Sequence, residues 1–143
     1  MKHILLPLDG SETSKRAVEQ ASAFAKAFPE VKFTFLYVIS HPEGEIMTNG
    51  SIMMQNAIDA EEERGERMLE KYAESFCDCK DRIEIKVAVG PVSNVIVDLA
   101  ESTDIDYIIM GSQGLGSAMR RLLVGSVAKK VLTSVDVPVL VVR

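Results

Sequence analysis

The sequence contains only two cysteines, Cys77 and Cys79, in the segment Cys-Asp-Cys. Two thiols cannot complete a structural zinc site, which takes four protein ligands. The chain of 143 residues is also long enough to bury about 68–70% of the surface of its unfolded state, so it needs no covalent staple. We therefore interpret both cysteines as reduced surface residues near a helix end, in preference to a redox or metal role.

Long apolar runs and an excess of positive charge are missing too. No apolar run approaches the ~20 residues of a membrane span, and the N-terminal run meets Asp9 too early for a secretory signal. The net charge of −5 argues against nucleic acids and acidic membrane surfaces as partners. We expect a cytoplasmic protein without a membrane partner. The charge does not exclude a nucleotide, which backbone donors and a helix dipole can hold.

The remaining composition is that of a globular domain, with 47% hydrophobic and 26% charged residues. The length suits one domain that spans residues 1–143. Short apolar runs alternate with segments of helical periodicity. The predicted strands are 3–8, 31–39, 83–89, 105–110 and 139–142, and the predicted helices are 11–28, 53–76, 93–102 and 127–134. We expect Ser11 to cap the first helix and Ser93 the third.

This alternation predicts an α/β fold in three layers, an open Rossmann-like sheet of five parallel strands with helices on both faces. Residues 111–126 connect the fourth strand to the last helix and are rich in glycine. Glycine lets backbone N–H groups approach phosphate oxygens closely. Ligands of open parallel sheets bind beyond the carboxyl ends of the strands, where the strand order reverses. Asp9 and Gly111 follow the first and fourth strands, so they share one site if these strands are neighbours.

Three segments resemble the universal stress protein family of the UspA type, in its ATP-binding branch. They are residues 4–12 (ILLPLDGSE), 106–114 (DYIIMGSQG) and 122–142, which begins LLVGSVAKKVL and ends VPVLVV. The resemblance implies the adenine nucleotide alpha hydrolase-like variant of the predicted fold. It also implies a dimeric regulatory protein of the stress response that binds ATP, alone or with Mg²⁺. Its homodimer would pair through Val139–Val142, a strand at a sheet edge.

The resemblance further implies a set of nucleotide-binding residues and assigns neither catalytic residues nor metal ligands. Asp9 would accept hydrogen bonds from adenine or ribose, the glycines and serines would donate to phosphates, and the apolar members would line the adenine pocket. The set is Pro7, Leu8, Asp9, Val38, Met110, Gly111, Ser112, Gly114, Gly125, Ser126 and Val127. Structural alternatives remain open: Asp9 and Ser126 as helix caps, and Val38 as a core residue.

The spacing within this set departs from the family in one respect. Ten residues separate Gly114 from Gly125, one more than in the family's pattern. Either the extra residue bulges at residues 116–117, or it shifts Gly111 and Gly114 relative to the start of the helix. The second outcome would weaken phosphate binding.

Two other functions compete with ATP-dependent regulation. A slow ATP hydrolase is one, although the sequence lacks the G-x-x-x-x-G-K-[ST] phosphate loop. The other is a UspA-like dimerisation or signalling module that binds no nucleotide. Ligand retained on purification separates this module from the two ATP-binding alternatives.

Overall fold

The computed structural model describes residues 1–40, 52–76, 79–102, 104–115 and 123–143. Strands and helices alternate along the chain as the sequence predicts. The strands are β1 (His3–Pro7), β2 (Lys32–Ser40), β3 (Ile83–Gly90), β4 (Tyr107–Gly111) and β5 (Val139–Val142). The helices are α1 (Glu12–Ala27), α2 (Ile52–Phe76), α3 (Val92–Ser102) and α4 (Ser126–Ser134), with a short 3₁₀ turn, η1, at Lys80–Arg82.

Helix capping was predicted correctly at α1 and wrongly at α3. Ser11 is the N-cap of α1, and its side chain accepts a hydrogen bond from the Ser14 N–H. Helix α3 already begins at Val92, so Ser93 lies inside its first turn and cannot cap it. The turn at Gly90-Pro91 explains this earlier start, because the Pro91 carbonyl accepts the hydrogen bond from the Val95 N–H.

The sheet is parallel throughout, with the strand order β3-β2-β1-β4-β5. Strands β1 and β4 are direct neighbours, with Ile4 opposite Tyr107 and Leu5 opposite Ile108. The chain therefore reverses its strand order between β1 and β4, as the expected shared site requires. Strand β5 lies at the edge of the sheet and pairs only with β4 among the described strands.

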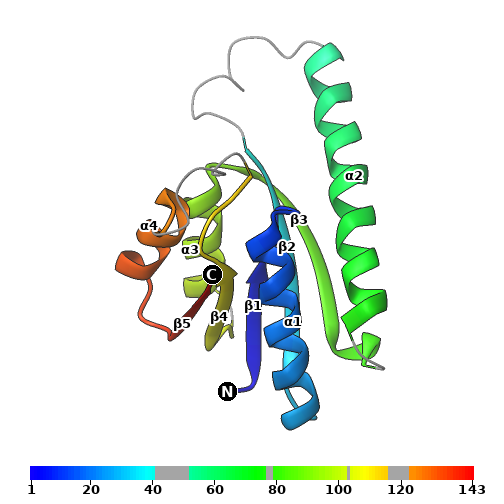
Figure 1. The fold of residues 1–143 in the computed structure, drawn as a ribbon. Coiled ribbons are helices and arrows are strands. Elements are labelled where there is room, and N and C mark those ends of the chain that lie inside the picture. Colours follow the sequence, from blue (N-terminus) through cyan, green and yellow to red (C-terminus); the bar gives the residue numbers. More distant parts are fainter. Residues whose placement is uncertain (41–51, 77–78, 103, 116–122) are drawn as a thin grey trace.

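Helices cover both faces of the sheet, which confirms the three-layer architecture (Figure 1). Helices α1 and α2 pack on one face, over a buried cluster that includes Leu6, Phe33 and Phe35. Helices α3 and α4 pack on the other, over a cluster that includes Leu36 and Met110. Successive residues of one strand, such as Phe35 and Leu36, thus pack against the helices on opposite faces of the sheet. This is why the strands are apolar throughout and do not alternate with polar residues.

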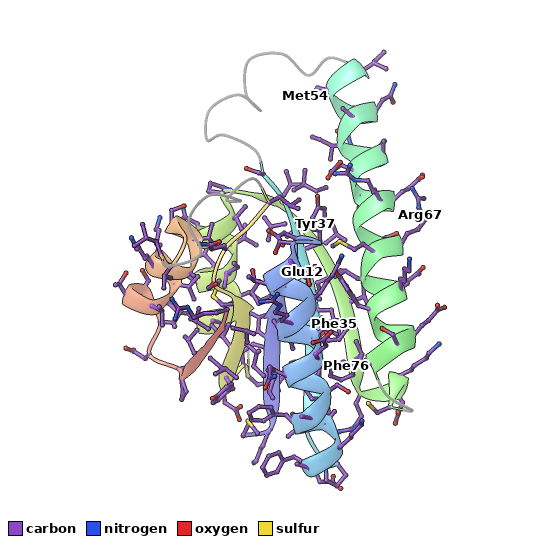
Figure 2. All side chains as sticks on the ribbon, in the orientation of Figure 1. Glu12, Phe35, Tyr37, Met54, Arg67 and Phe76 are labelled. Atoms are coloured by element: carbon purple, nitrogen blue, oxygen red, sulfur yellow. The ribbon has the colours of Figure 1, made fainter. Side chains whose placement is uncertain are left out.

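The buried apolar side chains by which helix α2 packs on the sheet lie in its C-terminal half. Phe76 lies edge-on against Phe35, with 5.2 Å between the ring centroids (Figure 2). The N-terminal half extends past the carboxyl ends of the strands (Figure 1), and Ile52 at its start is 80% exposed. Although α2 is long, no described helix is apolar enough over sufficient length to cross a membrane.

The interpretation of the cysteines was wrong for Cys79. Its side chain is only 6% exposed and belongs to the core cluster under α1 and α2. The residue is disulfide-bonded, not a reduced thiol. Cys77 lies outside the described residues. The sequence around the Cys-Asp-Cys segment gave no sign that the side chain of Cys79 is buried in the core just before η1.

Candidate functional site

The candidate site lies where β1 and β4 end side by side. From this point β1 continues into α1 on one face of the sheet, and β4 leads through the glycine-bearing loop to α4 on the other. The divergence of the two connections leaves a crevice beyond the strand ends. It is a cavity of about 320 Å³, within the range of small-molecule sites.

Asp9 connects the two sides of this crevice. Its Oδ1 accepts a hydrogen bond from the Ser11 N–H at 2.9 Å, and its Oδ2 accepts one from the Leu115 N–H at 3.2 Å. The cap of α1 is Ser11, so Asp9 is not the helix cap of the alternative interpretation. A carboxylate offers about four acceptor positions, and these two bonds leave acceptor capacity for a ligand.

The two ends of the glycine-bearing loop are joined by their backbones. Ser112, which is only 5% exposed, accepts a hydrogen bond from the Gly125 N–H at 2.7 Å through its carbonyl oxygen. Its own N–H donates to the Val142 carbonyl at 2.7 Å. A Cβ on Gly125 would lie 3.2 Å from the Ser112 oxygen, so glycine permits this close approach.

Helix α4 presents its N-terminus to the cavity without a side-chain cap. Gly125 is the N-cap, so Ser126 is the first helical residue and not the cap of the alternative interpretation. The first turn of α4 holds no acidic residue. Helix α1 differs, because Ser11 caps it and Glu12 lies in its first turn. Of α1 and α4, α4 is therefore the helix whose positive dipole end lacks compensation by a cap or an acid.

All eleven residues of the predicted set line the one cavity. They comprise Pro7, Leu8 and Asp9 after β1, Val38 in β2, Met110, Gly111, Ser112 and Gly114 at the end of β4, and Gly125, Ser126 and Val127 at α4. The structure thus brings together segments that are as far apart in the sequence as β1 and α4. It does not by itself assign them a ligand.

The cavity has further lining residues that the sequence analysis did not place there. They are Ser11, Ser14, Leu36, Val92, Ile96, Gln113, Leu115 and Ala128. The missed signal at Val92 is its position directly after the β3 turn, at the same edge of the sheet as Asp9 and Gly111.

Tyr72 of α2 lies close to the outer side of the site. Burial is the main cause that raises the pKa of its hydroxyl, and a hydrogen bond with Ser14 opposes the rise. The negative charges of Asp9 and Glu12 raise the same pKa further. Within the described ranges, no group of three or more His, Cys, Asp or Glu residues could hold a metal ion. Residues 116–117, where a bulge was one alternative, lie outside those ranges.

Known proteins are similar to this chain in sequence and in fold. Residues 1–143 match the profile of the universal stress protein family. Universal stress protein MJ0531 of Methanocaldococcus jannaschii is 32% identical over 99% of this chain and 82% of its own. The solved structure of MJ0577 from the same organism is 30% identical, with a TM-score of 0.84 over 99% of this chain and 94% of that one. A universal stress protein solved in complex with cAMP is 25% identical, with a TM-score of 0.67 over 99% and 96% of the two chains.

Proposed function

The chain belongs to the universal stress protein family, and we propose that within it this protein is a dimeric, ATP-binding regulator of the stress response. One observation carries the proposal: the eleven residues that the resemblance implies surround a single cavity at the point where the strand order reverses. A related structure contains cAMP, which is an adenine nucleotide. The cytoplasm remains the expected compartment.

The chemistry of the cavity suits a nucleotide in one orientation. One wall is apolar and includes Val38, Val92 and Ile96, which suits the faces of an adenine ring. The uncapped N-terminus of α4 suits phosphate oxygens. Asp9 repels phosphate and accepts hydrogen bonds, so we place the ribose or the adenine edge beside it and the phosphates towards Gly125.

Mg²⁺, if it enters with ATP, would be carried chiefly by the phosphates. In nucleotide sites this ion keeps several water ligands and uses one or two carboxylates together with phosphate oxygens. Regulation would then follow from occupancy of the site, because any ligand that binds the folded state stabilises it.

We expect purified protein to carry adenine nucleotide and to bind ATP in solution. The ligand is released by heat, identified by mass spectrometry and then titrated calorimetrically as ATP with and without Mg²⁺. Asp9→Ala should weaken ATP binding by about tenfold or more, because a hydrogen bond to a charged group contributes about 1.5–3 kcal/mol. Asp136→Ala, an exposed acid before β5, is the matched control and should leave the affinity unchanged.

Three results would count against this proposal or a part of it. Wild-type protein that neither retains nor binds an adenine nucleotide would favour the dimerisation module without nucleotide. Phosphate release from ATP above background would instead indicate the slow hydrolase. Equal losses of affinity in Asp9→Ala and Asp136→Ala would remove Asp9 from the site.

The proposed homodimer uses β5. All four of its residues are only partly buried, and one edge of the strand has no partner among the described strands. The Ile108 N–H donates to the Pro138 carbonyl and the Ser112 N–H to the Val142 carbonyl. Even-numbered positions of β5 thus face β4, and alternation turns the N–H groups of Val139 and Val141 outwards, where a second copy can pair.

We expect Val141→Pro to produce folded monomers, because proline removes an outward N–H and leaves the ladder to β4 in place. Light scattering measures the mass, and circular dichroism checks the fold. Leu140→Pro is the contrasting variant, which should lose solubility because it faces β4 and contacts the core. A Val141→Pro protein that remains dimeric would move the interface away from β5.

A further inference from the structure

Gln113 joins the glycine-bearing loop to the first turn of α1 through its main chain. Its carbonyl oxygen accepts hydrogen bonds from Thr13 Oγ1 at 2.5 Å and Ser11 Oγ at 3.2 Å. Its N–H donates to Thr13 Oγ1 at 3.3 Å. The backbone at Gln113 is therefore held against the first turn of α1, which lies outside the loop.

The side chain of Gln113 reaches across the loop. Its Nε2 donates to the carbonyl oxygen of Leu123 at 2.8 Å, ten positions further along the chain. This bond lies beside the one from the Gly125 N–H to the Ser112 oxygen. Two consecutive residues on the β4 side, 112 and 113, thus bind two residues just before α4, and together these bonds close the base of the loop.

We infer that Gln113 is a positioning residue of the nucleotide site: it closes the base of the loop, so that the length of the loop does not alter the spacing between Gly111–Gly114 and the start of α4. The inference rests on the proposed function, because the spacing that it protects is that of the phosphate-binding groups. The residue in excess of the family's pattern falls between Gly114 and Gly125. The two bonds fix Ser112, Gln113 and Gly125, which border the loop on its two sides.

Loop energetics agree with this role. Closing a loop costs entropy that grows only slowly with its length, so one extra residue beyond a closed base costs little. Without the side-chain bond, the Ser112–Gly125 hydrogen bond alone would oppose the added freedom of a longer loop. The position needs an uncharged donor long enough to reach Leu123. Glutamate would bring a second acceptor against that carbonyl, and asparagine is one methylene shorter.

The first test needs no nucleotide. Gln113→Met keeps the length of the side chain and removes its donor. Its amide hydrogen exchange at Gly125 should be faster than in wild type by roughly threefold to tenfold, the effect of one net hydrogen bond. Exchange in the core strand at Phe35 should be unchanged. Gln20→Met, at an exposed position of α1, is the matched control and should change neither. Unchanged exchange at Gly125 would overturn the inference.

The second test separates positioning from general stability. One or two glycines are inserted between residues 117 and 118, in wild type and in Gln113→Met, and the affinity for ATP is measured. Wild type should tolerate both insertions within about twofold, whereas Gln113→Met should lose about threefold to fivefold more affinity with the longer insertion. A role in stability alone would lower the melting temperature without this dependence on loop length.

The outcomes keep the two proposals apart. Equal sensitivity to insertion in both backgrounds, or none in either, overturns the role of Gln113 and leaves ATP binding intact. A wild-type protein that does not bind ATP overturns the proposed function, and the exchange experiment then still decides whether Gln113 closes the loop.

Discussion

Gly65→Ala should destabilise the protein, although alanine normally stabilises the interior of a helix by about 1 kcal/mol relative to glycine. Gly65 is a buried residue in the middle of α2. A Cβ at this position would lie 2.2 Å from Cδ1 and 2.8 Å from Cε1 of the Tyr37 ring. Because no real contact is that short, either the ring or the helix must shift. Overpacking of this kind costs about 1–3 kcal/mol, and the severity of the clash puts the net loss at about 2 kcal/mol.

The Tyr37 ring lies beside α2 (Figure 2), and its hydroxyl is tied to that helix. Its hydroxyl donates a hydrogen bond to Glu61, whose Oε1 also accepts one from Arg64 Nη2 at 2.5 Å. The bond from Tyr37 is the main cause that lowers the pKa of the Glu61 carboxyl. The carboxylate is therefore ionised near neutral pH, and its support for the ring is lost only as the pH falls through that lowered pKa.

Urea unfolding measures the change at Gly65, with Glu66→Ala as an exposed neighbouring control that should lie within about 0.5 kcal/mol of wild type. In a Tyr37→Ala background the clash is gone, and Gly65→Ala should then stabilise the protein by its helix propensity, about 1 kcal/mol. If Gly65→Ala alone stabilised the protein, the packing of α2 on Tyr37 would be refuted.

The sequence predicted those features of the fold that depend on local pattern. Apolar runs located every strand to within about two residues. The alternation of strands and helices predicted a parallel sheet, because strands joined through helices usually pair in parallel. The site followed from chemistry that is confined to strand ends, with Asp9 after β1 and Gly111 at the end of β4. The sequence left open whether β1 and β4 are neighbours, because their adjacency depends on the strand order of the whole sheet.

The errors and omissions occur where tertiary contacts decide the outcome. Cys79 is buried by the chain turning inward, which no periodicity reports. The role of Gln113 depends on the hydrogen bond from its side chain to Leu123. A single glutamine in a loop shows no sequence pattern from which that bond could be predicted. The sequence did hold one sign of the contact between α2 and Tyr37, which is a glycine, Gly65, inside a highly charged helical segment.

Gly111→Ala should both destabilise the protein and remove most of its affinity for ATP. A Cβ at Gly111 would lie 2.9 Å from the Ser14 nitrogen, 2.9 Å from the carbonyl carbon of Thr13 and 2.5 Å from Thr13 Oγ1. Two of these atoms are backbone of the first turn of α1 and cannot rotate away. The end of β4 must therefore separate from α1, which strains the bond from the Gln113 N–H to Thr13. We expect a loss of about 2–3 kcal/mol in the free energy of unfolding and a loss of more than about tenfold in affinity.

Gly114→Ala is the contrasting variant, because the two glycines of the predicted phosphate pair have different surroundings. Among the described residues, the Cβ at Gly114 would meet only the Asp9 Oδ2 atom, at 2.9 Å, and a carboxylate can rotate. Gly114→Ala should therefore keep the free energy of unfolding within about 0.5 kcal/mol of wild type. It should weaken ATP binding, because the added Cβ displaces Asp9. Gly111 would then serve the packing of β4 on α1, and Gly114 the approach to the ligand. If both variants lowered stability equally, or if Gly111→Ala unfolded at the wild-type midpoint, this division of roles would be wrong.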